Sequence, residues 1–136
     1  MNGGEPQPMP QPALACDQIV YRVLASAKLL DFLPQAFLLR LRDKDTGLSI
    51  SYNCTLDEAR YSLTRSYGVL SLHVGRVRTL NLDVVPDEPQ HANIIGLPYK
   101  EDNPELAERM ASLLAKQARI VDQGLRKRPE SATTNE

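Results

Sequence analysis

The sequence predicts a single α+β domain over residues 17–123, built from a mixed, mainly antiparallel sheet with two helices packed on it. Two patterns carry this prediction. Apolar and polar residues alternate over short runs at 48–52 and 69–74, which is typical of strands with one buried face, and a strand-like run bounded by turn residues follows at 92–97. A long amphipathic segment at 103–122 follows them and predicts a helix whose apolar stripe covers the sheet. A length of 136 residues fits one domain.

The beginning of the chain predicts an extended leader followed by a strand. Residues 1–16 are rich in Pro, Gln and Gly, and their alternating prolines remove backbone donors, so we expect a disordered, polyproline-like arm. The β-branched and aromatic run 19–23 is typical of a strand, and the domain begins with it. The apolar run 37–41 is a candidate second strand, because turn-like residues follow it at 43–47.

A helix is predicted to begin at Thr55. The Thr55 hydroxyl can accept a bond from the backbone three residues on, and Glu58 can return that bond, which is the pattern of a capping box. Gly68 is a natural stop, so the predicted helix covers 55–66. Further along, residues 75–81 predict a single helical turn.

The second half of the chain predicts two more strands and the longest helix. A strand at 83–85 gives way to a loop at 86–89, because its two prolines are excluded from a sheet interior. Asn103 caps the long helix, and Gly124 ends it. Residues 124–136 are mostly small, polar or charged and predict a disordered tail. The predicted core combines residues of the sheet and of the long helix: Leu48, Ile50, Leu70, Leu72, Val74, Ile94, Leu106, Met110, Leu113 and Leu114.

Composition and charge exclude several classes of protein. A net charge of −1 and a pI near 6.1 argue against bulk binding to nucleic acid, and no apolar run approaches the length of a membrane span. Cys16 and Cys54 stand 38 residues apart without histidines at ligand spacing, so we expect no metal site. The sequence carries no secretory signal, which predicts a reduced, cytoplasmic location.

Five residues form the candidate ligand site. Arg22 can clamp a phosphate or a carboxylate, and hydroxyls of Ser49 and Ser51 can assist it from a second strand. Tyr21 adds an aromatic ring, and His91 stands where a Pro-rich loop meets a strand. For each of these residues a structural role is the alternative: a charge at the surface or on an edge strand for Arg22, and an imidazole bonding loop carbonyls for His91.

His73 and His91 are the two histidines of the chain. Their sequence contexts resemble those of a two-histidine phosphoesterase only superficially. That class has a hydroxyl residue two places after each histidine and two related half-domains, and neither feature is present here. Of the two histidines, we therefore take only His91 as a candidate for chemistry.

Several stretches resemble a family of small uncharacterised bacterial proteins. The similar stretches are Tyr21-Arg22, Ala36-Phe37 with Arg40, the run 45–50, the run 74–82 and the run 86–94. Members of that family often carry a His-Pro pair just after the Tyr-Arg, where this chain has Val23-Leu24. The resemblance implies a shared fold and a bacterial origin, and it implies no activity.

Two functional hypotheses follow. The first is a non-catalytic accessory or protein-binding module without a cofactor, which contacts a protein partner through the amphipathic helix or a sheet edge. The second is a small nucleotide-handling enzyme, because an early Arg and a later Ser before a helix are similar to ADP-ribosyltransferase-like folds that use NAD. Its catalytic candidates are Arg22, Ser49 and His91, and it requires these residues to lie around one cleft.

Overall fold

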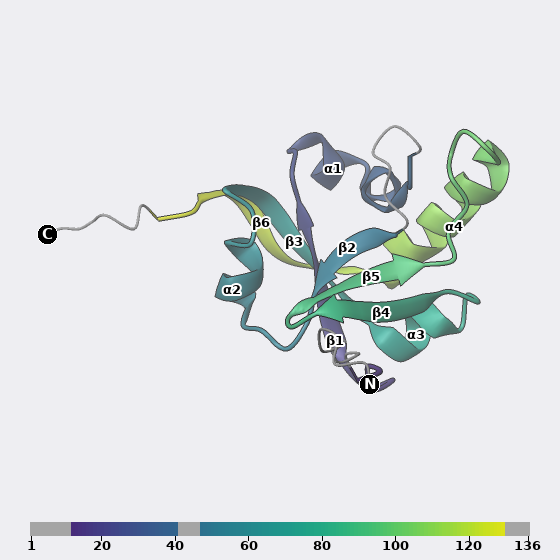
Figure 1. The fold of residues 1–136 in the computed structure, drawn as a ribbon. Coiled ribbons are helices and arrows are strands. Elements are labelled where there is room, and N and C mark those ends of the chain that lie inside the picture. Colours follow the sequence, from purple (N-terminus) through teal and green to yellow (C-terminus); the bar gives the residue numbers. More distant parts are fainter. Residues whose placement is uncertain (1–11, 41–46, 130–136) are drawn as a thin grey trace, which may run out of the picture.

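The computed structural model describes residues 12–40 and 47–129, and it confirms the predicted α+β class. The sheet has six strands in the order β4-β5-β2-β1-β3-β6, and every neighbouring pair is antiparallel (Figure 1). A single parallel bridge joins Leu39 to Tyr99 outside these strands. The strands are β1 (Ile19–Leu24), β2 (Leu48–Ser51), β3 (Arg65–His73), β4 (Asp83–Glu88), β5 (His91–Ile95) and β6 (Arg119–Lys127).

Short helices connect the strands, and one long helix follows β5. The long helix begins as predicted, because Asn103 accepts a bond from the backbone of Leu106 and Pro104 occupies the first helical position. The helices are α1 (Lys28–Asp31), the 3₁₀ helix η1 (Leu33–Phe37), α2 (Leu56–Arg60), α3 (Val74–Arg78) and α4 (Pro104–Gln117).

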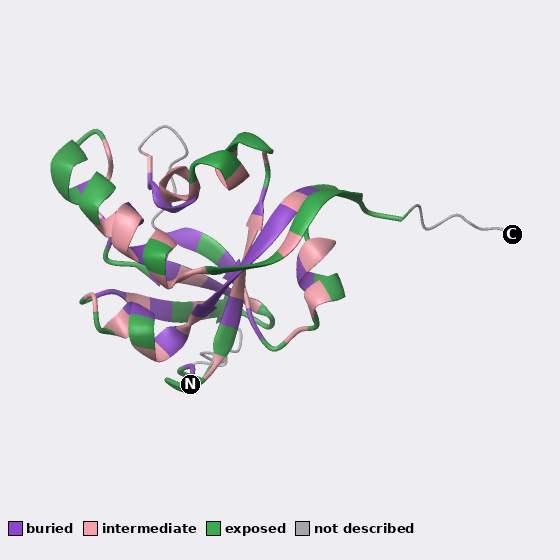
Figure 2. Ribbon diagram, turned by 180° about the vertical axis from the view of Figure 1, so that it is seen from behind, coloured by how far each residue is buried: buried purple, intermediate pink, exposed green. Residues whose placement is uncertain are grey.

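The core lies on one face of the sheet, between the strands and the packed helices (Figure 2). The residues predicted from the sheet are all buried, and α4 packs against η1. The buried stripe of α4 differs from the predicted one, because Leu106 is exposed and Leu113 only half-buried. The buried stripe of α4 consists of Ala107, Ala111 and Leu114, and two of these three residues are small alanines.

The predicted end of the long helix is wrong. The helix stops at Gln117, where Ala118 turns to extended backbone, and Arg119 already belongs to β6. The strand reaches Lys127 and therefore continues beyond the expected domain end at 123 into the segment predicted as a tail. The physical reason is the long strand β3, which pairs with β6 along its otherwise open side.

Two shorter elements also differ from the prediction. The run 37–41 does not form a strand: Phe37 closes η1, and only Leu39 makes a bridge, while residue 41 lies outside the described part of the chain. The helix predicted for 55–66 ends at Arg60, because β3 begins at Arg65 and needs those residues as a connection.

The last residues of the predicted disordered leader, 12–16, belong to the folded domain. Leu14 is buried in the core, and Cys16 accepts a backbone bond from Gly75 at 2.7 Å. A side chain at Gly75 has no room, because its Cβ would stand 2.8 Å from the Cys16 carbonyl oxygen. The packing of Leu14 keeps residues 12–16 on the domain, and residues 1–11 lie outside the described part.

The predicted loop at 86–89 is instead mostly strand. Pro86 and Glu88 belong to β4, and the chain turns at Pro89 and Gln90 before β5. This position tolerates proline because β4 is an edge strand, which has one side without ladder hydrogen bonds.

Candidate functional site

A row of polar side chains crosses the middle of the sheet on the face opposite the core. Tyr21 of β1 pairs with Ser51 of β2, and Ser51 pairs in turn with His91 of β5. Tyr52 donates its backbone N–H to the Gln90 carbonyl, so the adjacent Ser51–His91 pair is not itself backbone-bonded. Side chains of such pairs stand closest across antiparallel strands, which places the serine hydroxyl beside the imidazole.

The five residues predicted from the sequence line one pocket of about 440 Å³. Strands β1, β2 and β5 supply them, while α1 and the connection after α2 add apolar walls. The polar members are Tyr21, Arg22, Ser49, Ser51, Ser62 and His91, and the apolar members are Val23, Ala25, Leu29, Ile50 and Leu63. A volume of this size lies within the range of small-molecule sites.

His91 is oriented by a carboxylate. Its Nδ1 lies 2.6 Å from Oδ1 of Asp87, and the other carboxylate oxygen accepts a bond from the Asn93 amide at 3.1 Å. Burial acts to raise the pKa of Asp87, but the bonds from His91 and Asn93 outweigh it and hold that pKa below its usual range. Nε2 of His91 has no hydrogen-bond partner among the residues that the structure describes.

Asp87 and Asn93 are site residues that the sequence did not reveal. Both depend on the β4-β5 hairpin, which folds Asp87 back toward a histidine four positions later. The available signal was the acid-to-histidine spacing across the Pro89-Gln90 turn, and the predicted loop at 86–89 concealed it.

Arg22 hydrogen-bonds backbone carbonyls beside its own strand. Its Nε donates to the Ala36 carbonyl of η1 at 3.0 Å, and its Nη1 donates to the Ser49 carbonyl of β2 at 2.9 Å. Strands β1 and β2 pair only at Tyr21 and Ser51, so the guanidinium bridges the gap where their ladder has opened. The alternative that Arg22 is a charge on an edge strand is wrong, because β1 lies inside the sheet.

The pocket offers hydroxyls and an oriented imidazole, but its described lining contains no Asp or Glu. ADP-ribosyltransferase-like enzymes usually place a catalytic Glu late in the core, and the exposed Glu88 side chain is not in this lining. Proton transfer by His91 is therefore the chemistry that the arrangement can supply, with Asp87 fixing the orientation of the ring.

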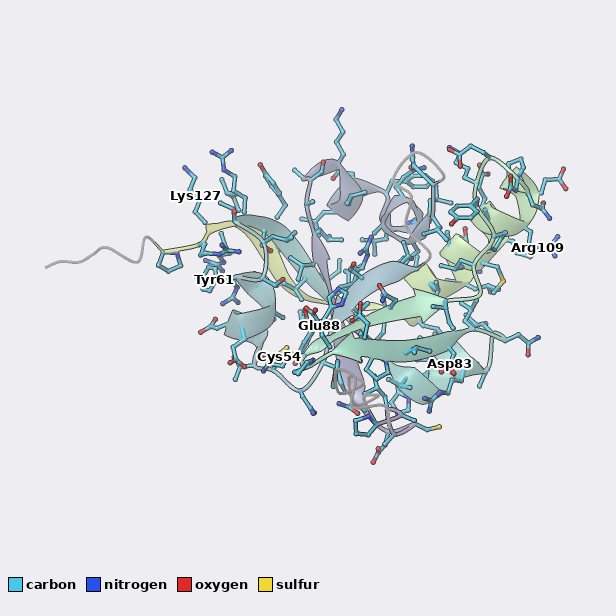
Figure 3. All side chains as sticks on the ribbon, in the orientation of Figure 1. Cys54, Tyr61, Asp83, Glu88, Arg109 and Lys127 are labelled. Atoms are coloured by element: carbon cyan, nitrogen blue, oxygen red, sulfur yellow. The ribbon has the colours of Figure 1, made fainter. Side chains whose placement is uncertain are left out.

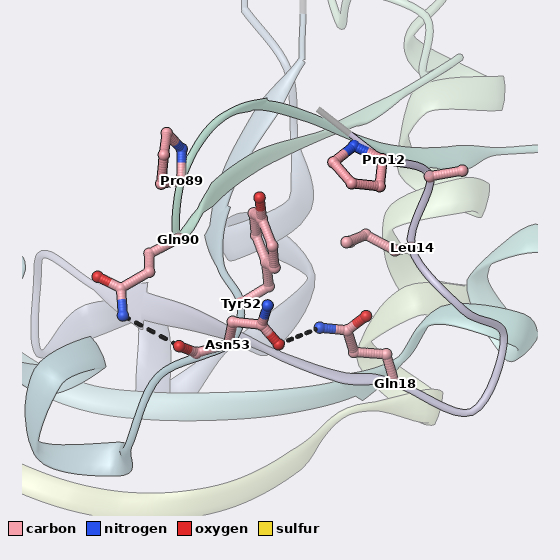
Figure 4. Close-up of a pocket in the computed structure, with 8 residues that line it drawn as sticks. Pro12, Leu14, Gln18, Tyr52, Asn53, Pro89 and Gln90 are labelled. Atoms are coloured by element: carbon pink, nitrogen blue, oxygen red, sulfur yellow. Dashed lines mark hydrogen bonds between the residues drawn. The ribbon is translucent and has the colours of Figure 1, made fainter. Parts of the chain in front are cut away.

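A second pocket, of about 340 Å³, lies where the amino-terminal segment meets the β4-β5 hairpin (Figure 4). Its polar groups bond one another: Gln18 donates to the Asn53 side chain, and Gln90 donates to the Asn53 carbonyl. The Tyr52 hydroxyl donates to the Glu88 carbonyl at 3.3 Å. The Gln18 bond attaches the amino-terminal segment to Asn53, and the other two bonds join Tyr52 and Asn53 to the β4-β5 hairpin, so the pocket has a structural explanation.

Strand β6 forms one exposed edge of the sheet (Figure 2). It exposes three large apolar side chains, Ile120, Val121 and Leu125, and no described strand pairs with its outer side. Asp122 is the buried exception, with Oδ2 bonded to Arg60 Nε at 2.9 Å and Oδ1 to Arg126 at 3.4 Å. The two arginines outweigh the effect of burial and lower the pKa of Asp122.

Comparisons with models of protein families, with curated proteins and with solved structures found no match to this chain. No helix within residues 12–40 and 47–129 is long and apolar enough to cross a membrane. Over the same ranges, no three His, Cys, Asp or Glu side chains gather into a group that can hold a metal ion.

Proposed function

We propose that this protein is a non-catalytic protein-binding module, an accessory protein of the bacterial cytoplasm, which binds an extended acidic segment of a partner along β6. The observation that carries the proposal is the β6 edge. Its outer side pairs with no strand of the described residues and carries exposed apolar side chains, and a partner strand can extend the sheet there.

The other candidate surfaces are less suitable. The edge strand β4 contains Pro86 and three acidic residues, which oppose pairing with a further strand. The amphipathic helix α4 uses its apolar stripe against η1, and Leu106 is its one exposed large apolar residue. Of the two contact modes considered from the sequence, the sheet edge is therefore the one that the geometry favours.

Charge identifies the kind of segment that β6 accepts. Residues 119–128 contain four basic residues and one acidic residue, and that acid already pairs with Arg60 and Arg126. Lys127 extends away from the sheet at the outer end of the strand (Figure 3). A strand alternating acidic and apolar residues complements this edge in charge and in hydrophobicity.

The NAD-using enzyme stays a prediction from the sequence. The gathering of Tyr21, Arg22, Ser49, Ser51 and His91 around one pocket favours it. The engagement of Arg22 by two carbonyls and the absence of a carboxylate from the described lining weigh against it. A binding module requires neither an arginine available for a ligand nor a carboxylate in this pocket.

The test is a titration of the full chain with a short peptide in which glutamate alternates with valine, followed by amide chemical shifts. We expect saturable shifts confined to β6 and its neighbour β3, and weaker binding at higher salt because exposed charges are screened. A peptide with lysine in place of glutamate is expected not to bind.

Matched double variants locate the binding edge. Replacing Val121 and Leu125 by Glu is expected to weaken binding by about tenfold or more, because acids then oppose the acidic peptide. The control replaces Val85 and Ile95 by Glu, since their exposed fractions of 39% and 37% resemble the 40% and 49% of the first pair. Equal losses in both variants, or shifts away from β6, would contradict the proposal.

A further inference from the structure

A third pocket, of about 180 Å³, lies at the junction of α3, α4 and the ends of three strands. It is separate from the pocket around His91 and shares no residue with it. Residues of β1, β3, α3, α4 and β6 line it: Ile19, Ser71, Leu72, His73, Arg76, Gln117 and Arg119.

Two buried polar atoms of this lining have no hydrogen-bond partner within residues 12–40 and 47–129, namely Nδ1 of His73 and Oε1 of Gln117. Gln117 donates its Nε2 to the Arg76 carbonyl at 3.0 Å, which fixes its amide and leaves the oxygen without a donor. Buried polar groups in native proteins are nearly always bonded, and a buried polar atom without a partner is destabilising. Both orphans in one pocket point to a group that bonds them there.

Two cations flank these atoms. Arg76 and Arg119 are exposed, and neither guanidinium has a hydrogen-bond or ion-pair partner among the described residues. By contrast, Arg60 and Arg78 are paired with aspartates. The described lining contains no Asp or Glu, so its net charge is positive.

We propose that this pocket binds the phosphate group of a small ligand. Arg76 and Arg119 supply the positive charge and the geometry that guanidinium groups offer to phosphate oxygens. His73 in its Nδ1–H form and the Ser71 hydroxyl donate to phosphate oxygens, and a protonated oxygen donates to Oε1 of Gln117. One group thereby satisfies both orphans and both arginines.

The size of the pocket agrees with a single group. About 180 Å³ lies below the roughly 300 Å³ at which sites for whole drug-sized molecules begin, so the pocket holds a phosphate while the rest of the ligand stays outside. A bound water can satisfy His73 and Gln117, but it leaves the two arginines without a counter-charge. The experiment therefore separates an anion from water.

The experiment titrates the full chain with inorganic phosphate at constant ionic strength and follows the His73 ring and the Gln117 side-chain amide by NMR. We expect saturable shifts of both groups with a millimolar or tighter dissociation constant. Sulfate carries no proton for Gln117 at neutral pH, so it should bind about tenfold more weakly. Equal binding of the two anions would overturn the bond assigned to Gln117.

Variants test which arginines supply the positive charge that binds phosphate. Arg76→Gln and Arg119→Gln are each expected to weaken phosphate binding by about tenfold. The control is Arg109→Gln, on the exposed side of α4 (Figure 3). Chemical shifts that do not saturate would overturn the site and leave water as its occupant. Equal weakening of phosphate binding by Arg109→Gln and Arg76→Gln would do the same.

Discussion

At the scale of single residues, a side chain that resembles a ligand clamp supports the backbone. The sequence predicts that Arg22 can bind an anion, because arginine binds phosphate and carboxylate well. In the structure its guanidinium bonds two backbone carbonyls at the point where β1 and β2 separate. A variant at this position therefore tests stability first and ligand binding second.

Arg22→Ala is expected to lower the free energy of unfolding by about 1–3 kcal/mol, because the Ala36 and Ser49 carbonyls lose a charged donor. Urea unfolding followed by circular dichroism measures the change. Arg65→Ala is the control, since Arg65 is exposed at the start of β3 and has no side-chain partner among the described residues. Stability equal to that of the control would show that Arg22 is dispensable for the fold.

At the scale of elements, α2 illustrates a signal that is entirely local. The Thr55 hydroxyl accepts from the Glu58 backbone at 3.1 Å, and the Glu58 carboxylate accepts from the Thr55 N–H at 2.8 Å. This is the capping box predicted from two residues three positions apart. The length of the helix was not local, because it was set by where β3 begins.

Thr55→Ala is expected to destabilise the protein by about 1 kcal/mol, because the backbone at the start of α2 loses its acceptor. Thermal unfolding measures it as a lowered midpoint. Thr64→Ala is the matched control, since Thr64 is an exposed threonine whose side chain makes no hydrogen bond with any described residue. A midpoint unchanged by Thr55→Ala would mean that the cap contributes nothing to stability.

At the scale of the whole molecule, ion pairs join helices to strands, one of them across 62 residues of sequence. Asp122 of β6 bonds Arg60 of α2, and Asp83 of β4 bonds Arg78 of α3 at 2.8 Å. Arg78 lowers the pKa of Asp83. The pKa of Asp122 is also lowered, because its arginine partners outweigh burial. These carboxylates therefore prefer the charged form more strongly in the folded chain than in the unfolded chain.

The free energy of unfolding is consequently expected to fall in acid. A carboxylate with a depressed folded pKa contributes its full stability above the unfolded value of about 3.9 and loses it as pH drops through the folded pKa. Urea unfolding at stepped pH from neutrality to strong acid measures this loss. Asp122→Asn should flatten the acid limb, whereas Asp102→Asn should leave the limb unchanged, since Asp102 is exposed and its side chain has no partner in the described part of the chain. An acid limb unchanged by Asp122→Asn would refute the assignment.

The sequence by itself determined the α+β class, the positions of β1, β2 and β5, and the caps of α2 and α4, because alternation and capping depend on neighbouring residues. It also selected five residues that do line one pocket. The roles of these residues, and the pairing of His91 with Asp87, depend on residues of neighbouring strands.

Tertiary structure alone decided the end of α4 and the stripe that it buries. The helical spacing of apolar residues continues past Gln117, so local sequence favours a longer helix. Pairing with β3 overrides that preference, because a nine-residue strand gains backbone bonds along its open side. Close contact with η1 likewise selects Ala107 and Ala111 over Leu106, since only small side chains allow the helices to approach.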